Sequence, residues 1–329
     1  MDPIRLQDDL EKYLSQNGLA TSVIELNEIN MGWETELFTF KKVQDGREEG
    51  LVLRIFSGEH SGDKATKEYY LMNRLSEVGY PVPNVYHIDT RGSVLGKPFI
   101  LMERIMGTTL DAAYQGTTPE NVQQGIHRLI GLFVELHRLD VSLFSDLPNV
   151  SKISYRDSIR RYHEACKKNI PWLKPVIEWL YKHQPDDNDE YCAICHNDYH
   201  GKNVMLNKKN QPYVIDWGAS NISDSRTDLA WTILLYTTFG GSMYRAPLIE
   251  TYSELGGKVD DLDFFEVLAA TRRIVDLGSV VFGTGSYGLK PDVLNLMREQ
   301  REHYSKVHDF LEERTGIRLK EFDSLLASF

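Results

Sequence analysis

Residues 192–203 read CAICHNDYHGKN, and two motifs overlap within this short stretch. Cys192 and Cys195 form a C-x-x-C pair followed by His196, a pattern typical of covalent haem attachment. The same stretch places His196, Asp198 and Asn203 in an H-x-D-x4-N pattern, which has the spacing of a phosphoryl-transfer loop. The two interpretations exclude each other, and the rest of the chain decides between them.

Length and composition indicate an ordinary globular protein. The chain has 329 residues, enough for one large domain or for two lobes with separate cores. Apolar residues make up 41% and charged residues 26%, which is typical of soluble domains. No apolar run approaches the roughly 20 residues that span a bilayer, and MDPIRLQDDL does not resemble a secretory signal. We therefore expect a cytoplasmic protein without a membrane partner.

Charge and cysteine content narrow the function classes. The net charge of −11 is spread along the chain, so we expect no nucleic-acid partner, which would need a concentrated basic face. An acidic protein would suit a cationic substrate. Three cysteines are too few for a disulfide framework, and a zinc site would need two ligands besides Cys192 and Cys195. We interpret this pair as small apolar residues on a strand, with a redox or metal protein as an alternative.

The first hundred residues show strand periodicity. Segments rich in β-branched and aromatic residues, separated by glycine or polar turns, predict five strands, of which the first three are antiparallel. These strands are expected at residues 22–29, 36–43, 51–56, 85–89 and 98–103. Helices are expected at 3–17, where Gly18 provides a C-terminal cap, and at 63–78, ended by Gly79.

After Gly107 the pattern becomes mainly helical. Thr118-Pro119-Glu120 has the cap, proline and acid of a helix start, and another helix is expected to begin near Asp260. The predicted fold is therefore α+β and bilobal. Residues 1–104 would form a small antiparallel β-sheet lobe with one helix, and residues 105–329 a larger, mainly helical lobe that contains the quoted stretch.

The acidic and amide residues of this second lobe suit phosphoryl transfer. That reaction needs a carboxylate near the attacking hydroxyl and oxygen ligands for Mg²⁺ on the phosphates. Asp198 can be the base, while Asn203 and Asp216 can supply the ligand oxygens. The segment between them, VMLNKKNQPYVI, reads as a strand–turn–strand that would fix the two ligands relative to each other.

The linked motifs resemble those of the protein-kinase-like superfamily, in which H-x-D-x4-N precedes D-x-G. The chain looks most like the aminoglycoside phosphotransferase family of small-molecule kinases. His200 and Gly201 match the loop of that family, and Trp217 stands where protein kinases usually have phenylalanine. LHRLD at 136–140 and TDLAW at 227–231 match two further elements. The resemblance covers roughly residues 20–285 and includes no A-P-E segment for peptide substrates.

The resemblance implies a nucleotide site in the first lobe, with ATP or GTP as donor and Mg²⁺ as cofactor. Arg54 matches the basic residue on the third strand that contacts phosphates, and Glu68 matches its helix partner. A loop around Gly32 would cover the phosphates, although it has only one glycine. Backbone groups near Glu103 and Ile105 would meet the adenine edge.

Other residues near the loop have structural interpretations. The resemblance implies that His196 packs and hydrogen-bonds within the loop, and Asp228 is expected to anchor it. His137 is expected to be a satisfied helix residue. His200 either contacts phosphate or a metal-bound water, or it supports the loop. Lys202 either attracts the γ-phosphate or is simply exposed.

The sequence therefore predicts an ATP- or GTP-dependent phosphotransferase that acts on a hydroxyl of a small molecule. The substrate can be aminoglycoside-like, an amino alcohol or a sugar. The alternative is a catalytically inactive, kinase-like module that binds a nucleotide or metabolite. Acids of the second lobe, such as Asp157, Glu164 and Asp276, would suit an amine, but they are equally expected on an ordinary surface.

Overall fold

A computed structural model describes residues 3–29, 35–186, 188–281 and 298–328. The chain begins with helix α1 (Pro3–Gln16) and continues into a five-stranded antiparallel sheet with the order β1-β2-β3-β5-β4. The strands are β1 (Ser22–Ile29), β2 (Thr35–Gln44), β3 (Arg47–Phe56), β4 (Val85–Asp89) and β5 (Phe99–Glu103). Helix α2 (Ser61–Glu77) connects β3 to β4.

The alternation of side chains along β3 determines what each face of the sheet contacts. Leu51, Leu53 and Ile55 are buried in a small core together with leucines of α1. The intervening positions point to the opposite face, where Val52 and Phe56 pack in a second core with residues of α2. Arg54 shares this second face, so the strand period directs its side chain toward α2.

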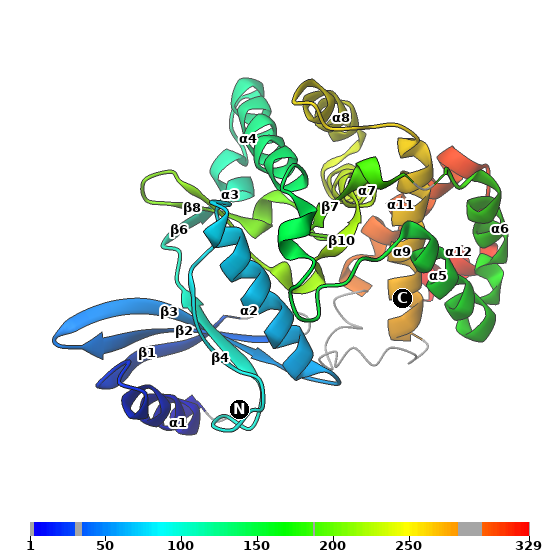
Figure 1. Cartoon of the computed structure of the whole chain (residues 1–329). Helices are drawn as coiled ribbons and strands as arrows, with labels where there is room; N and C mark the ends of the chain where they lie inside the picture. Colours follow the sequence, from blue (N-terminus) through cyan, green and yellow to red (C-terminus); the bar gives the residue numbers. More distant parts are fainter. Residues whose placement is uncertain (1–2, 30–34, 187, 282–297, 329) are drawn as a thin grey trace.

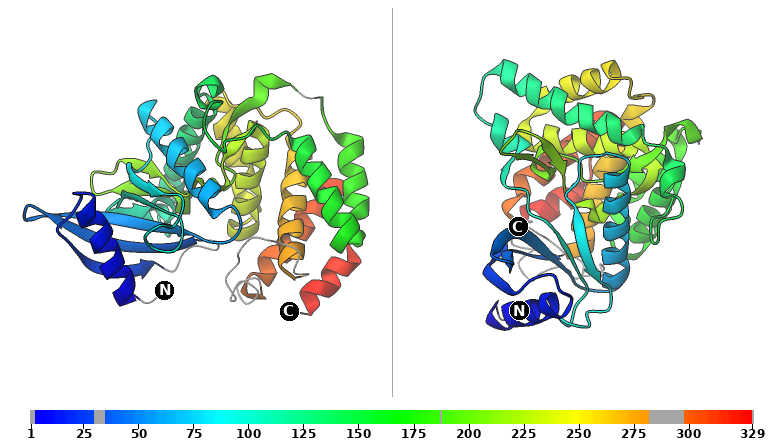
Figure 2. Two further views of the ribbon diagram at one scale, coloured as in Figure 1. Left: turned by 60° about the horizontal axis from the view of Figure 1, so that its bottom comes forward. Right: turned by 60° about the vertical axis from the view of Figure 1, so that its left-hand side comes forward.

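The rest of the chain is mainly helical, and Figure 1 shows it as the larger part of the molecule. Its helices are α3 (Leu110–Tyr114), α4 (Pro119–His137), α5 (Tyr155–Asn169), α6 (Lys174–His183), α7 (Ser225–Leu235), α8 (Arg245–Glu254), α9 (Leu262–Val281), α11 (Arg301–Thr315) and α12 (Lys320–Ala327). Figure 2 shows α1 and the sheet at one end of the molecule and α5, α6 and α12 at the other.

Two small antiparallel sheets lie between these helices. One has the order β6-β8-β9 and the other pairs β10 with β7. Their strands are β6 (Gly107–Thr109), β7 (Cys192–Cys195), β8 (Val204–Asn207), β9 (Pro212–Val214) and β10 (Asn221–Asp224). The quoted stretch therefore begins on β7 and ends where β8 begins.

The predicted α+β fold is confirmed, and the expected elements occur close to their predicted bounds. Thr118 caps α4, and its hydroxyl accepts the N–H of Asn121, with Pro119 in the first turn. The division into residues 1–104 and 105–329 stays a prediction. Buried residues of α2, such as Leu71 and Leu75, belong to the same continuous core as the helical part.

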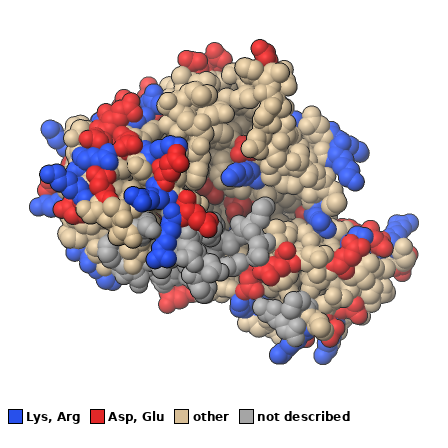
Figure 3. Space-filling model, turned by 180° about the vertical axis from the view of Figure 1, so that it is seen from behind, with Lys and Arg blue, Asp and Glu red and all other residues tan. Residues whose placement is uncertain are grey.

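The surface agrees with the spread of charge along the sequence. Where charged side chains appear on the face in Figure 3, acids and bases lie close to one another. Among the helices of the described part of the chain, none combines the length and the apolar character that a bilayer span requires.

His303 is a titratable group within the helical core. Its ring is 4% exposed and stacks on Phe239 at a centroid distance of 3.8 Å. Its Nε2 accepts a hydrogen bond from Nε of Arg273 at 3.0 Å, so the ring is held in the neutral form. Burial, together with the charges of Arg273 and Lys306, lowers the pKa of His303 to about 3.

This lowered pKa predicts a loss of stability in mild acid. Below pH 6.5 the unfolded chain protonates His303 while the folded chain does not, so the free energy of unfolding falls as pH falls. Between pH 6.5 and pH 5 the expected loss is about 2 kcal/mol from this residue alone. Urea denaturation at both pH values should show a smaller pH effect in His303→Gln. Equal pH effects in the two proteins would contradict the prediction.

Candidate active site

The hairpin after the quoted stretch brings Asn203 and Asp216 together. Val204 of β8 pairs with Val214 of β9, and the N–H of Ile215 donates to the carbonyl of Asn203 at 2.9 Å. Asp216 follows directly. The structure therefore places both predicted ligand residues at the open end of one hairpin.

Asp198 lies in the loop between β7 and this hairpin. Nε1 of Trp231 donates to its Oδ1 at 3.1 Å, and Nε2 of His200 is 3.6 Å from its Oδ2. Burial raises the pKa of this carboxyl group, but His200 and the indole N–H outweigh it and lower the pKa well below its usual range. The side chain is still 37% exposed, so the carboxylate is ionised and can be reached from solvent.

Asn203 is oriented by the same loop. Its Nδ2 donates to the backbone carbonyl of Asp198 at 2.9 Å and lies 3.4 Å from Nε2 of His200. With the amide nitrogen turned into the loop, Oδ1 is the atom that can ligate a metal. His200 lies near both Asp198 and Asn203, which favours the second of its two interpretations, support of the loop.

Arg54 links the sheet to the hairpin. Its Nη2 donates to Oδ1 of Asp216 at 2.7 Å, and its Nε lies 3.3 Å from Oε2 of Glu68. The Glu68 side chain is only 1% exposed, and burial raises its pKa while the charge of Arg54 opposes that effect. A side chain at Gly218 would begin 3.3 Å from Nη2 of Arg54, so glycine allows this close approach.

Two residues of the site have a left-handed backbone. Asn197, directly before Asp198, has φ of 62°, and Asp216 has φ of 67°. This conformation costs a non-glycine residue on the order of 1 kcal/mol and is concentrated at functional sites. The strain supports a functional interpretation of both segments.

Asp228 anchors the loop, as expected. Its two carboxylate oxygens accept the backbone N–H groups of His196 and Asn197. Nε2 of His137 lies 3.3 Å from Oδ2 of Asp228, and its Nδ1 lies 2.7 Å from the hydroxyl of Tyr252. His137 is therefore a satisfied helix residue.

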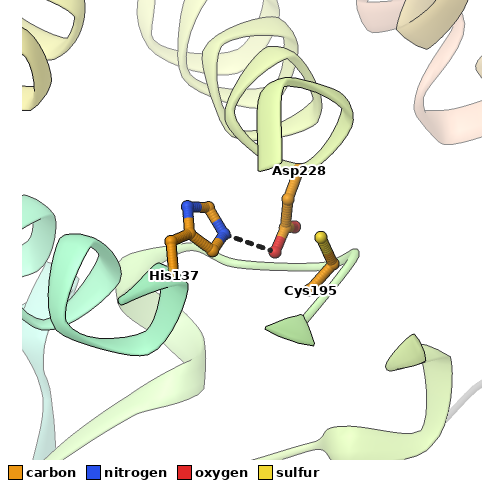
Figure 4. Close-up of side chains that lie close together, drawn as sticks. All are labelled: His137, Cys195 and Asp228. Atoms are coloured by element: carbon orange, nitrogen blue, oxygen red, sulfur yellow. Dashed lines mark hydrogen bonds and ion pairs between the residues drawn. The ribbon is translucent and has the colours of Figure 1, made fainter. Parts of the chain in front are cut away.

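Cys195 lies beside this anchor. Figure 4 shows Cys195, His137 and Asp228 near one another. The Sγ of Cys195, one ring nitrogen of His137 and one carboxylate oxygen of Asp228 all lie within 4.8 Å of one another. Burial raises the pKa of the Cys195 thiol well above its usual range, which disfavours the thiolate that a metal requires. Cys192 and Cys195 are both free thiols, so the apolar interpretation of the C-x-x-C pair agrees with their surroundings.

The predicted adenine contacts lie at the end of β5 and in the segment that leads to β6. Glu103 accepts hydrogen bonds on its carboxylate from the backbone and side chain of Asn84. Within the described part of the chain, the backbone N–H and carbonyl of Ile105 make no hydrogen bond, so both can meet a ligand. Gly32 falls in residues 30–34, outside the described residues.

Several contacts of the candidate site involve residues that the sequence did not predict to belong to it. Lys67 of α2 donates from Nζ to the carbonyls of Gly218 and Ser220 at 2.7 and 3.0 Å. Trp231 belongs to the TDLAW segment, but its bond to Asp198 is not visible in the motif. In the sequence, the position of Lys67 directly before Glu68 is the feature that could have predicted its place near the site.

Sequence comparison relates the chain to known proteins. A sequence profile of the Phosphotransferase enzyme family matches residues 25–265. Acyl-CoA dehydrogenase family member 10 from Mus musculus is 25% identical over 248 residues, covering 70% of this chain and 22% of that protein. Acyl-CoA dehydrogenase family member 11 from Homo sapiens is 27% identical over 180 residues, covering 52% and 23%. The chain thus spans about a quarter of these relatives.

Solved structures show the same fold. A Ralstonia eutropha protein assigned to the aminoglycoside phosphotransferases has a TM-score of 0.69 at 20% identity, covering 93% of this chain and 98% of that one. A GDP and kanamycin complex of APH(2")-IIIa has a TM-score of 0.63 at 16% identity, covering 93% and 98%. Choline kinase LicA from Streptococcus pneumoniae has a TM-score of 0.61 at 15% identity, covering 94% and 99%.

Proposed function

Because this chain belongs to the phosphotransferase enzyme family, we propose that it transfers the γ-phosphoryl group of ATP or GTP to a hydroxyl of a small molecule. The observation that carries the proposal is the convergence of four residues from three segments of the chain. Asp198, Asn203, Asp216 and Arg54 lie within one connected set of contacts.

Asp198 is the proposed base. Its lowered pKa keeps it ionised, so it can accept a hydrogen bond from the acceptor hydroxyl and orient the oxygen toward the phosphorus. Trp231 holds one carboxylate oxygen through its N–H, which limits rotation of the side chain. The proton passes to Asp198 as the hydroxyl oxygen bonds to the γ-phosphorus and the bond from that phosphorus to the bridging oxygen of the β-phosphate breaks, which releases ADP or GDP.

Asn203 and Asp216 fit Mg²⁺. Their oxygens are hard ligands, and the Asp216 side chain is 44% exposed at the open end of the hairpin. The ion supplies positive charge to the phosphates when bound. Arg54 now contacts Asp216, and its planar guanidinium can also hold phosphate oxygens once a nucleotide is present. Glu68 keeps Arg54 on the side of α2 that faces the site.

The first test measures Mg²⁺-dependent loss of the γ-phosphate from ATP and from GTP. The panel of acceptors contains amino alcohols, aminoglycosides, macrolides and sugars, with Asp198→Asn alongside. Turnover that an acceptor stimulates and the substitution abolishes is the expected result. A nucleotide that raises the melting temperature without any turnover would favour the alternative, an inactive nucleotide-binding module. Absence of any nucleotide effect would contradict the assignment of Arg54.

Lys67 is expected to set the position of the segment that carries Asp216. Lys67→Met removes two charge-assisted hydrogen bonds to carbonyls, those of Gly218 and Ser220. We expect the Mg²⁺ concentration for half-maximal rate to rise at least tenfold, because each such bond contributes roughly 1.5–3 kcal/mol and about 1.4 kcal/mol is a tenfold change. Lys67→Arg should restore most of the affinity for Mg²⁺. An unchanged Mg²⁺ requirement in Lys67→Met would show that the contact does not position Asp216.

A further inference from the structure

An arginine lies beside the proposed base on the helical side of the site. Arg272 is on α9, and its Nη1 donates to the backbone carbonyl of Asn197 at 2.9 Å. Its guanidinium carbon lies 3.8 Å from the ring centroid of Trp231. The same indole donates to Asp198, so one aromatic ring separates the guanidinium from the base.

The charge of Arg272 is only weakly balanced. Within the described part of the chain, the carboxylate in ion-pair range is that of Asp276, whose Oδ2 lies 3.9 Å from Nε. That distance is too long for a hydrogen bond. Nη2 of Arg272 makes no hydrogen bond to any described residue. The side chain is 29% exposed, compared with 37% for Asp198, so both groups can be reached from solvent.

Three acids that the sequence suggested for a cationic acceptor each have a partner within the chain. Asp157 caps α5 by accepting the N–H of Ser154 at 3.0 Å, and it also pairs with Arg160. Glu164 accepts a hydrogen bond from Lys167 at 2.9 Å. Asp276 lies next to Arg272 itself. Arg272 is a fixed cation one aromatic ring away from Asp198.

We infer that the acceptor carries an oxyanion, a carboxylate or a phosphate monoester, and that Arg272 binds this group while the hydroxyl faces Asp198. The inference rests on the proposed function and names its substrate class. The Asn197 carbonyl and the Trp231 ring hold the guanidinium plane, which reduces the entropy lost when an oxyanion binds. An oxyanion at Arg272 would also offset the otherwise weakly balanced charge.

The first experiment compares charged and neutral acceptors that have the same carbon skeleton. Straight-chain hydroxycarboxylates of increasing length are assayed with Mg²⁺ and ATP or GTP beside their neutral amides. Hydroxyl-bearing phosphate monoesters form a second arm, and choline and kanamycin a third. We expect turnover in the first or second arm, which distinguishes the two oxyanions, and a marked loss when the charge is removed. Preference for the amides or for the third arm would overturn the inference and leave the phosphotransferase proposal intact.

Arg272→Gln tests the residue itself. It removes the charge and leaves a neutral amide on a shorter side chain. The KM for an anionic acceptor should rise about ten- to a hundredfold, as expected for a lost charge-assisted contact, with kcat nearly unchanged. The KM for a matched amide should not change, and Arg272→Lys should restore part of the affinity. Arg273→Gln is the charge control, because Arg273 is adjacent on α9 but donates to His303 and Gln300.

A purely structural role for Arg272 has a different signature. If the residue only holds the loop through Asn197, Arg272→Gln lowers kcat equally for charged and neutral acceptors, and that result would overturn the inference.

A binding measurement does not depend on turnover. Alkyl carboxylates and alkyl phosphates without a hydroxyl should raise the melting temperature of the wild-type chain with Mg²⁺ and a non-hydrolysable nucleotide, and not that of Arg272→Gln. Equal shifts in both proteins would overturn it. Failure of every nucleotide to bind would instead defeat the proposed function.

Discussion

Asp198→Asn is expected to lower kcat by about 10²–10⁴-fold, the usual contribution of a positioned general base. The substitution preserves the shape of the side chain, and Trp231 can still donate to its Oδ1. It removes the negative charge that orients the acceptor hydroxyl and receives its proton. The measurement is the rate of γ-phosphate transfer at saturating nucleotide and acceptor.

The control for this prediction is nucleotide affinity. Asp198→Asn should bind nucleotide and Mg²⁺ nearly as well as the wild type, because Arg54 and Asp216 are unchanged. Asp189→Asn is the matched variant outside the site. Its carboxylate is 91% exposed and pairs with Lys152, so its rate should equal that of the wild type. A loss smaller than about tenfold in Asp198→Asn would exclude general-base catalysis by Asp198.

Glu266→Ala is expected to produce the largest loss of stability. Its carboxylate is 0% exposed and joins three helices, α8, α9 and α11. Nε and Nη2 of Arg245 donate to it at 2.8 and 3.0 Å, and Nε of Arg314 donates at 2.6 Å. Removing the carboxylate leaves two arginine charges without their shared partner, and Arg314 is only 9% exposed. Breaking a buried ion pair in this way costs about 3–5 kcal/mol.

The free energy of unfolding from urea denaturation tests this prediction. Glu313→Gln is the matched control, because Glu313 also pairs with Arg314 but is 79% exposed. Exposed pairs contribute about 0–1 kcal/mol, so the control should change stability little. Similar losses in the two variants would mean that burial does not set the strength of this network. Glu266 lies away from the proposed site, so nucleotide affinity of the folded fraction should be unchanged.

The sequence predicted the sheet because strand periodicity is a local property. The alternation through LVLRIF placed Arg54 opposite the face that packs on α1. The proximity of Asn203 and Asp216 was predictable for the same reason, because a short hairpin brings the ends of its two strands together. Asp198 lies only five residues before Asn203. The sequence did not predict helices α3, α5, α6, α7, α8, α11 and α12.

Other features of the site depend on residues far apart in the chain. Lys67 reaches the carbonyl of Gly218 across 151 residues, Trp231 reaches Asp198 across 33, and Arg272 reaches Asn197 across 75. Charged and aromatic residues such as these have no periodic signature, and most of them lie on ordinary surfaces. The sequence by itself determined the fold class and pointed to the three residues of the proposed phosphoryl-transfer motif, because both follow from short-range patterns. Only the tertiary structure decided which cations face the site, because that choice depends on how α2, α7 and α9 pack around the loop.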